Sequence, residues 1–317
     1  RGSEMCIRDR AMLLNNLSYV YARQGRVGLA RPLAHEALGI NESMGNRYSA
    51  ALTLSTLATI ERLRGAYPEA IDYGEQALAN FREMEDAYGI ALSYHGLAAA
   101  TRKLAKRSIE EGRKLDEAKK KLENAESNLN SALEEAVKSH IQALAPQIKA
   151  EQGKVYREMG RLAARVPEMS HPSVYFRRSE GCFQDALQHN IGSIEKADIE
   201  QDWAETLFAA DDDQAANEHL RRARDLIGES YQIKPGQSFQ GDGLARENFW
   251  IMGKVERLSG DIAFQRHLIE QGVEHYVLSH IYFALFSPEA LEIDTVLQSM
   301  YRYLRQLPAE NLSLIHI

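Results

Sequence analysis

The sequence predicts an all-α fold built from antiparallel helical hairpins. Three observations predict it: the composition favours helices, one pattern of small and apolar residues recurs along the chain, and apolar residues within each copy are spaced by three or four. Of the 317 residues, 44% are hydrophobic and 26% are charged, which provides enough apolar surface for a packed core. The 8 prolines and 2 tryptophans are few, whereas alanine and leucine are abundant, a balance typical of helices.

The recurring pattern has a period of 40 residues near the start of the chain. Its first copy contains Ala11, Leu14, Leu17, Ser18, Gly25, Ala30, Ala37 and Leu38, and its second contains Ala51, Leu54, Leu57, Ala58, Gly65, Ala70, Ala77 and Leu78. A third copy begins at Ala91. The spacing places the apolar positions on one helix face and the glycine ends the helix at a chain reversal, so each copy is a predicted hairpin. Short side chains at Ser18, Ala58 and Ala98 are expected to let the paired helices approach closely.

The pattern L-x-x-L-[GAS]-x-x-[YE]-x-x-x-G, followed by two alanines seven residues apart, resembles the tetratricopeptide repeat, and the resemblance covers most of the chain. The period is longer than the usual length of about 34 residues. Such long variants resemble the helical sensor arms of multidomain regulatory ATPases. The resemblance implies a right-handed superhelical solenoid whose first helices line a concave groove that binds a peptide or partner protein.

The later copies are degenerate but keep the frame, which predicts an array of about six hairpins over residues 11–286. The third hairpin is predicted to be extended, because Ala118 and Ala125 keep the seven-residue spacing but come eight positions late. Its charge-rich insertion is either a solvated helical extension or a coiled-coil finger that grips a partner. Residues 287–310, with Ser287 as N-cap, are predicted to form a C-terminal capping helix.

The two ends are expected to lie outside the fold. Residues 1–10 and 311–317 resemble translated sequencing-adapter sequence, with an ordinary disordered tail as the alternative. An adapter-derived start would make the chain a fragment, with a further domain expected upstream of Ala11. Between the fifth and sixth copies, residues 233–243 are rich in glycine and contain Pro235, which predicts a loop.

The overall charge disfavours two classes of partner. A net charge of -7 and a pI near 5.9 give nucleic acids and anionic membranes no general attraction to the chain, so neither is an expected partner. The longest apolar stretch, Tyr276–Phe286, is too short to cross a bilayer. The two cysteines are typical of a reducing compartment, so a cytoplasmic location is expected.

Motifs for catalysis or cofactor binding are absent from the sequence. The segment 241–245 lacks the lysine and hydroxyl residue of a phosphate loop, and Asp211 to Asp213 lack the calcium-loop pattern. His275 and His280 are five residues apart and do not share a helix face, and Cys182 is expected to be an inert core thiol. The chain is therefore expected not to be an enzyme and to need no cofactor or metal.

One stripe of residues suggests a binding surface. When the copies are aligned, their twelfth positions read Ala22, Arg62, Arg102, Arg157, Phe208 and Arg257. The tetratricopeptide resemblance implies that this position faces the groove, as do the neighbouring positions. The candidate peptide-binding residues are then the four arginines Arg62, Arg102, Arg157 and Arg257, with Lys103, Lys154, Lys254, Asn15, His95 and Trp250 beside them.

Arginine forks bind carboxylates in a two-point geometry, so this arginine ladder predicts an acidic protein or peptide partner. The alternative is that the arginines pair within the fold with Glu61, Glu158 or Glu256. The leading functional prediction is a scaffold for protein–protein interaction, which leaves oligomerisation open. The alternative role is that of a C-terminal sensor arm of a signal-transducing ATPase.

Overall fold

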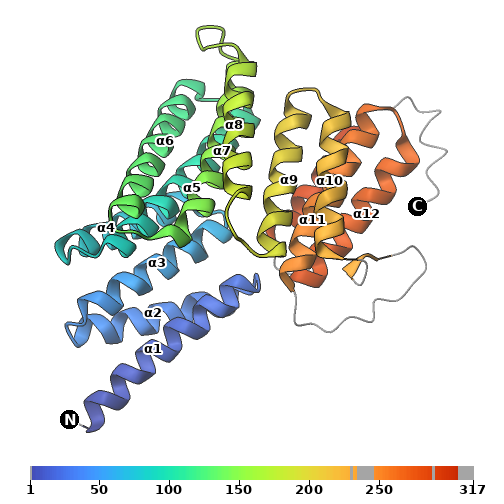
Figure 1. The fold of residues 1–317 in the computed structure, drawn as a ribbon. Helices are drawn as coiled ribbons and strands as arrows, with labels where there is room; N and C mark the ends of the chain where they lie inside the picture. Colours follow the sequence, from blue (N-terminus) through green and yellow to red (C-terminus); the bar gives the residue numbers. More distant parts are fainter. Residues whose placement is uncertain (1, 229–230, 234–245, 288–289, 306–317) are drawn as a thin grey trace. The chain divides into compact units, whose positions relative to one another are not determined.

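The computed structural model describes residues 2–228, 231–233, 246–287 and 290–305. All regular secondary structure in these ranges is helical, which confirms the all-α prediction (Figure 1). The predicted loop 233–243, except its first residue, lies outside the described residues, as do segment 241–245 and the predicted tail 311–317. The chain divides into two compact units, residues 1–189 and 190–317, which we call unit 1 and unit 2.

Unit 1 consists of four consecutive helical pairs. Its helices are α1 (Gly2–Arg23), α2 (Val27–Ser43), α3 (Arg47–Leu63), α4 (Tyr67–Glu83), α5 (Ala87–Glu111), α6 (Leu115–Lys138), α7 (Ala145–Ala163) and α8 (Pro172–Leu187), with a 3-10 turn at Gln142–Leu144. Each odd-numbered helix packs against the helix that follows it, and α1, α3, α5 and α7 also contact one another in sequence. The first helices of successive hairpins therefore lie side by side.

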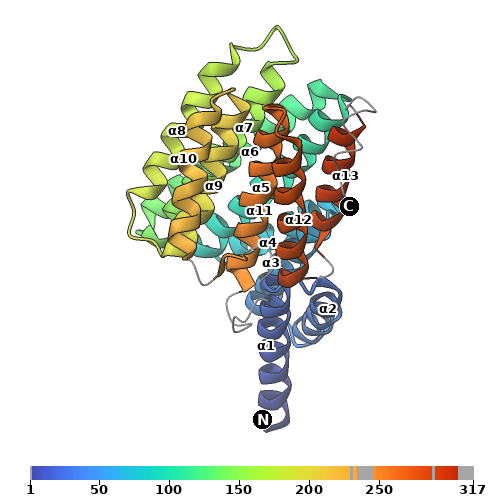
Figure 2. The same cartoon turned by 90° about the vertical axis from the view of Figure 1, so that its right-hand side faces the viewer.

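Unit 2 contains two further pairs and a single final helix. Helix α9 (Ser193–Ala209) pairs with α10 (Asp213–Ile227), and α11 (Arg246–Gln265) pairs with α12 (Ile269–Phe286). Helix α13 (Leu291–Leu304) packs on α12 (Figure 2). It lies within the segment predicted to cap the array.

The hairpin turns follow from the repeated glycines. Gly25 and Gly65 have φ values of 72° and 76°, in the left-handed region that glycine adopts without strain. Of the small residues placed between paired helices, Ser18 and Ala98 are fully buried, whereas Ala58 is only partly buried. The third hairpin is longer than its neighbours, since α5 and α6 have 25 and 24 residues and α3 and α4 have 17 each.

The fourth and sixth hairpins share a second internal repeat, in which equivalent residues are 100 positions apart. The Ser179 hydroxyl donates a hydrogen bond to the Gly153 carbonyl over 2.7 Å, and Ser279 does the same to Gly253 over 2.7 Å. A Cβ atom on Gly153 would lie 2.7 Å from the Phe183 ring. A side chain at this glycine would therefore collide with the aromatic ring that seals the hairpin.

Two boundaries differ from the sequence-based expectation. Residues 2–10 extend α1 by helical turns and do not form a separate disordered tail; Arg10 in this extension pairs with Glu36 of α2. Ser287 is the C-cap of α12, where its backbone N–H donates to the Phe283 carbonyl, and is not the N-cap of the last helix. The described part of α13 begins at Leu291. A serine before a proline fits the helix-start pattern, but α13 begins at Leu291 with Ala290 at its N-cap position, so Ser287 lies three residues too early for this role.

Candidate functional site

A group of charged residues from three adjacent first helices forms the candidate site in unit 1. Helix α3 contributes Arg62, α5 contributes His95 and Arg102, and α7 contributes Glu151 and Lys154. These five residues, which we call the first-helix cluster, lie close enough to shift one another's pKa values. They come together because successive hairpins place their first helices side by side.

Glu151 and Arg102 are the centre of the cluster. The Arg102 Nε donates to Glu151 Oε1 over 2.6 Å, and both side chains are 5% exposed. Lys154 Nζ lies 3.4 Å from the other carboxylate oxygen. Burial works against both charges, but the ion pair raises the pKa of Arg102, and the nearby cations hold the pKa of Glu151 well below its usual range.

Arg62 has a different environment. Its side chain makes no hydrogen bond or ion pair with any residue that the structure describes. Burial lowers the pKa of Arg62, and the positive charges of Arg102 and Arg23 lower it further, although Glu151 attracts it. Its guanidinium is therefore a partly buried cation beside a carboxylate that Arg102 and Lys154 already contact.

His95 is neutral at pH 7. Burial lowers its pKa to about 4; the negative charge of Glu151 acts to raise this pKa, and the positive charges of Lys154, Arg62 and Arg102 act to lower it. The charged members of the cluster are then three cations and one anion. An excess of positive charge in a chain of net charge -7 is suited to an acidic ligand.

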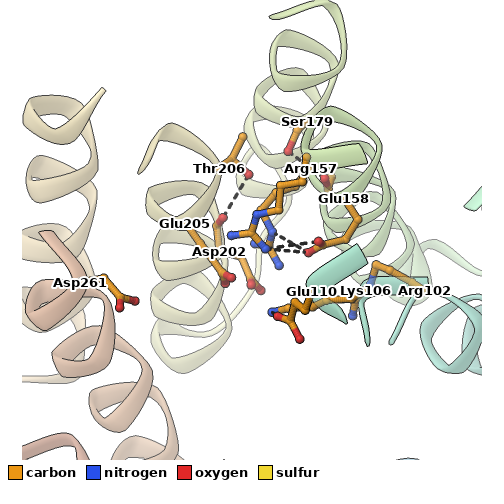
Figure 3. Close-up of polar contacts among 12 residues, drawn as sticks. Arg102, Lys106, Glu110, Arg157, Glu158, Ser179, Asp202, Glu205, Thr206 and Asp261 are labelled. Carbon is orange, nitrogen blue, oxygen red and sulfur yellow. Dashed lines mark hydrogen bonds and ion pairs between the residues drawn. The ribbon is translucent and has the colours of Figure 1, made fainter. Parts of the chain in front are cut away.

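The third predicted arginine of unit 1 pairs within the fold. Arg157 Nε lies 3.3 Å from the neighbouring Glu158 Oε1 (Figure 3). Arg161 Nη1 contacts the same oxygen over 3.1 Å. Arg157 therefore pairs with Glu158, as expected for a ladder arginine that pairs within the fold. Glu61 and Glu256 are the other two glutamates expected to pair with the ladder arginines, and they pair with different arginines.

Glu61 and Glu256 each bind an arginine from the second helix of the preceding hairpin. Arg31 Nε donates to Glu61 over 2.7 Å, and Arg224 Nε donates to Glu256 over 3.1 Å. Glu61 is 1% exposed. These pairs hold consecutive hairpins together and leave Arg62 unpartnered among the described residues.

In unit 2, the cations of the predicted ladder form ion pairs with carboxylates of the same unit. Lys254 Nζ lies 2.7 Å from Asp198 Oδ1, and Arg257 lies 3.4 Å from Asp261. The Trp250 ring packs against Phe283 and Phe286 of α12, at centroid distances of 5.4 and 5.0 Å. Lys254, Arg257 and Trp250 thus all have partners within unit 2.

The remaining candidates, Asn15 and Lys103, do not belong to the first-helix cluster. Asn15 is on α1, and its buried Oδ1 has no hydrogen-bond partner among the described residues. Lys103 is half-buried on α5. Sequence reasoning missed Glu151, the one carboxylate of the cluster. The only signal for it is a single glutamate at the sixth position of the fourth copy.

The described residues contain no group of three or more histidine, cysteine or acidic residues placed to hold a metal ion. Cys182 is half-buried, and burial raises the pKa of its thiol to about 11, so it is protonated at neutral pH. Among the described helices, none is both long and apolar enough to span a membrane.

A family model described as the tetratricopeptide repeat matches residues 9–83. This part of the chain is a tetratricopeptide-repeat array. The match spans α1 to α4, which are the helices of the two copies that repeat most closely. The tetratricopeptide repeats support a role as a protein-interaction scaffold. No curated protein matches the sequence.

Several solved structures resemble the chain at low identity. The crystal structure of BtubC (BKLC) from P. vanneervenii is 18% identical, with 74% of this chain and 87% of that chain covered and a TM-score of 0.45. Pseudomonas aeruginosa pilF is 14% identical, with 94% and 99% covered and a TM-score of 0.41. The apo form of the quorum sensor NprR from B. thuringiensis is 11% identical, with 92% and 87% covered and a TM-score of 0.28.

Proposed function

We propose that this chain is a non-catalytic protein-binding module whose first-helix cluster takes an acidic segment of its partner. The observation that carries the proposal is Arg62, a partly buried guanidinium without a described ion-pair partner. Removing a charge from water is costly unless an opposite charge compensates for it. A carboxylate of the ligand would supply the compensation.

The rest of the cluster supports an acidic ligand over a neutral one. Glu151 is already shared by Arg102 and Lys154, so it does not neutralise all three cations. A ligand carboxylate at Arg62 would gain charge-assisted hydrogen bonds of about 2.7–2.9 Å in a partly desolvated setting, where such bonds are strongest. Candidates are an acidic side chain or a free C-terminal carboxylate.

The test is a titration with a fluorescein-labelled peptide rich in aspartate and glutamate, with a free C-terminus. We expect Arg62→Gln to weaken binding by about tenfold, equivalent to about 1.4 kcal/mol. Raising the salt from about 50 to about 500 mM should weaken binding to the parent protein. The control is Arg177→Gln, an exposed arginine of α8. Equal binding by the parent protein and Arg62→Gln would contradict the proposal.

The role of a sensor arm in a larger ATPase remains a prediction. It would use the same cluster for contact with another protein or domain, so the titration does not separate it from a general scaffold. Examination of the parent gene for a phosphate-loop domain would distinguish the two roles.

A further inference from the structure

A pocket of about 430 Å³ lies where the first two hairpins of unit 1 meet. It is formed by the C-terminal end of α2, the N-terminal half of α3 and the C-terminal half of α4. Four of its lining residues carry side-chain carboxamides: Asn41, Asn46, Gln76 and Asn80. Ala50 and Leu54 of α3 add apolar surface. The pocket therefore combines hydrogen-bonding groups with apolar surface, and it is built within one unit.

The equivalent positions at the next hairpin junction carry larger side chains. Forty residues along the chain, three of the lining residues are replaced by bulkier ones: Asn41 by Phe81, Ala50 by Ile90 and Leu54 by Tyr94. Phe81 is 0% exposed and packs in a buried cluster with Ile90. The Tyr94 hydroxyl accepts a hydrogen bond from Arg82. The first junction is therefore left open by three residues that are smaller than their repeat equivalents.

Packing explains why residue 41 is small, but not why it is polar. Phe81 fits because residue 89 is a glycine, where a Cβ atom would lie 2.2 Å from the ring. The first junction has Ser49 at this position, so an aromatic ring at residue 41 would meet the serine Cβ. Leucine, with a shape close to that of asparagine, would fit the same space without burying a polar group. The residue present is instead Asn41, a carboxamide that is only 2% exposed.

The hydrogen bonds around Asn41 fix the direction of its carboxamide. Its Nδ2 donates to Thr53 Oγ1 over 3.3 Å. The Thr53 hydroxyl can only accept this bond, because its own proton is donated to the Ser49 carbonyl over 2.8 Å. The Nδ2 group therefore points at Thr53, outside the pocket lining, and Oδ1 faces the pocket. This oxygen accepts no hydrogen bond from the residues that the structure describes, which leaves it for a ligand.

The next junction shows that the fold does not require an asparagine at residue 41. There Phe81 takes the position of Asn41, and Ser93 takes that of Thr53. Ser93 is 5% exposed, and its hydroxyl has no hydrogen-bond partner within the described part of the chain. The repeat thus tolerates a buried hydroxyl at this position without a carboxamide beside it.

The hydrogen-bonding groups of the pocket favour a neutral ligand that both donates and accepts. Asn41 Oδ1 requires a donor, whereas Asn46 Oδ1 already accepts from the Ser49 N–H over 3.3 Å, which leaves Asn46 Nδ2 as a donor. The two charged lining residues, Glu42 and Arg47, are exposed and opposite in sign. A carboxylate has no proton for Asn41 Oδ1, and an ammonium group cannot accept from Asn46 Nδ2. A carboxamide provides both functions, on two separate atoms.

We propose that this pocket binds the side-chain carboxamide of a glutamine or asparagine in a partner protein. The ligand NH₂ group donates to Asn41 Oδ1, its carbonyl accepts from Asn46 Nδ2, and its methylene groups contact Ala50 and Leu54. The choice of a protein as the source rests on the proposed protein-binding function. The pocket is nevertheless apart from the first-helix cluster, because Arg62 lies twelve residues beyond Ala50 on α3, or about 18 Å along the helix. The two sites can therefore be tested separately.

The test follows the Leu54 methyl signals by NMR while the full chain is titrated with the peptide acetyl-Gly-Ala-Gln-Ala-Gly-N-methylamide. We expect saturable shifts of these signals, because Leu54 lines the pocket. Two further peptides replace the glutamine by methionine, which is similar in length but lacks the amide, or by glutamate, which has no proton to donate at neutral pH. Both should bind at this pocket at least about tenfold more weakly.

Two variants alter the pocket in different ways. Asn41→Leu removes the acceptor and keeps the approximate shape of the side chain. Ala50→Ile keeps Asn41 and its bond to Thr53, and narrows the pocket with the residue found at position 90. Each variant should weaken binding of the glutamine peptide at least about tenfold, and melting curves verify that each is folded.

The matched control is Asn124→Leu, at an exposed asparagine of α6, which should bind the glutamine peptide like the parent protein. Arg62→Gln should also bind it like the parent, whatever its effect on acidic peptides, which separates this pocket from the first-helix cluster. Unchanged Leu54 signals with the glutamine peptide, or equal shifts with the methionine peptide, would overturn the proposal. Equal binding of the glutamine peptide by the parent protein and either pocket variant would likewise overturn it.

Discussion

Arg62 and Arg102 occupy the same position of successive repeats, yet their pKa values shift in opposite directions. The difference is one carboxylate: Glu151 hydrogen-bonds Arg102 and only attracts Arg62 from a distance. The equivalent positions of the two arginines were predictable from the 40-residue period. The partner was not, because Glu151 comes 49 residues after Arg102 and belongs to a copy where that period has been lost.

Replacing the central carboxylate should be costly. Glu151→Gln removes the negative charge that compensates Arg102 and Lys154 while leaving the cations in place. We expect a loss of about 3 kcal/mol in the free energy of unfolding, as for a broken buried ion pair. Urea denaturation measures it, with Glu123→Gln at an exposed site of α6 as control, where a change within about 0.5 kcal/mol is expected. A loss as small as the control's would mean that water already compensates Arg102.

His95 should make stability depend on pH. Its pKa of about 4 in the folded protein lies below the value of about 6.5 for an unfolded chain, so the unfolded state binds more protons between these values. His95 therefore favours unfolding progressively as the pH falls from about 6.5 to about 4. We expect His95→Gln to lose about 1–2 kcal/mol less than the parent protein between pH 7 and pH 5. The control is His189→Gln, at an exposed position; identical pH profiles for the parent and His95→Gln would show that His95 does not titrate in this window.

At the scale of the helical hairpin, close approach of glycine and an aromatic ring recurs. Gly153 meets Phe183, Gly160 meets Phe176, and Gly253 meets Phe283. Sequence periodicity predicted the hairpins and the frame of the first three copies, because each carries its own apolar stripe and turn glycine. It missed the 100-residue repeat of these contacts, because the aromatic rings belong to the second helices and are not part of the repeated pattern.

Two glycines of the fourth hairpin provide a matched pair of substitutions. Gly153→Ala should destabilise the hairpin by about 1–3 kcal/mol, because the added methyl overlaps the Phe183 ring at 2.7 Å. Gly181→Ala lies within α8 with nothing within 4 Å of the new Cβ, so it should leave stability unchanged or raise it by up to about 1 kcal/mol. Thermal denaturation followed by circular dichroism compares them. Equal melting temperatures would show that Phe183 moves aside without cost.

At the scale of the whole molecule, the chain divides into two units after residue 189, and tryptophan fluorescence reports on one of these units alone. Both tryptophans of the chain, Trp203 and Trp250, belong to unit 2. Far-ultraviolet circular dichroism reports the helices of both units. Sequence analysis predicted a single array over 11–286 and gave no sign of the division, because neither composition nor helical periodicity changes there.

We expect the two units to unfold independently, as compact units of a repeat protein can. Gly153→Ala should then lower the urea midpoint seen by circular dichroism and leave the midpoint of tryptophan fluorescence unchanged. Gly253→Ala, at the equivalent site of unit 2, should lower the fluorescence midpoint. Parallel shifts of both signals in both variants would instead mean that the chain unfolds as one cooperative block.

The length of the third hairpin has a consequence for the order in which the chain folds. Its second helix buries Ala118, Leu122, Ala125, Leu129 and Ala132 completely. Neighbouring residues in one hairpin meet after closure of a short loop, which costs little conformational entropy. In an array whose repeats contact only their neighbours, folding starts where the local unit is most stable and spreads outward. The α5–α6 hairpin is thus the expected nucleus of unit 1, and α1, at the far edge, is expected to be the last helix to join and the first to fray.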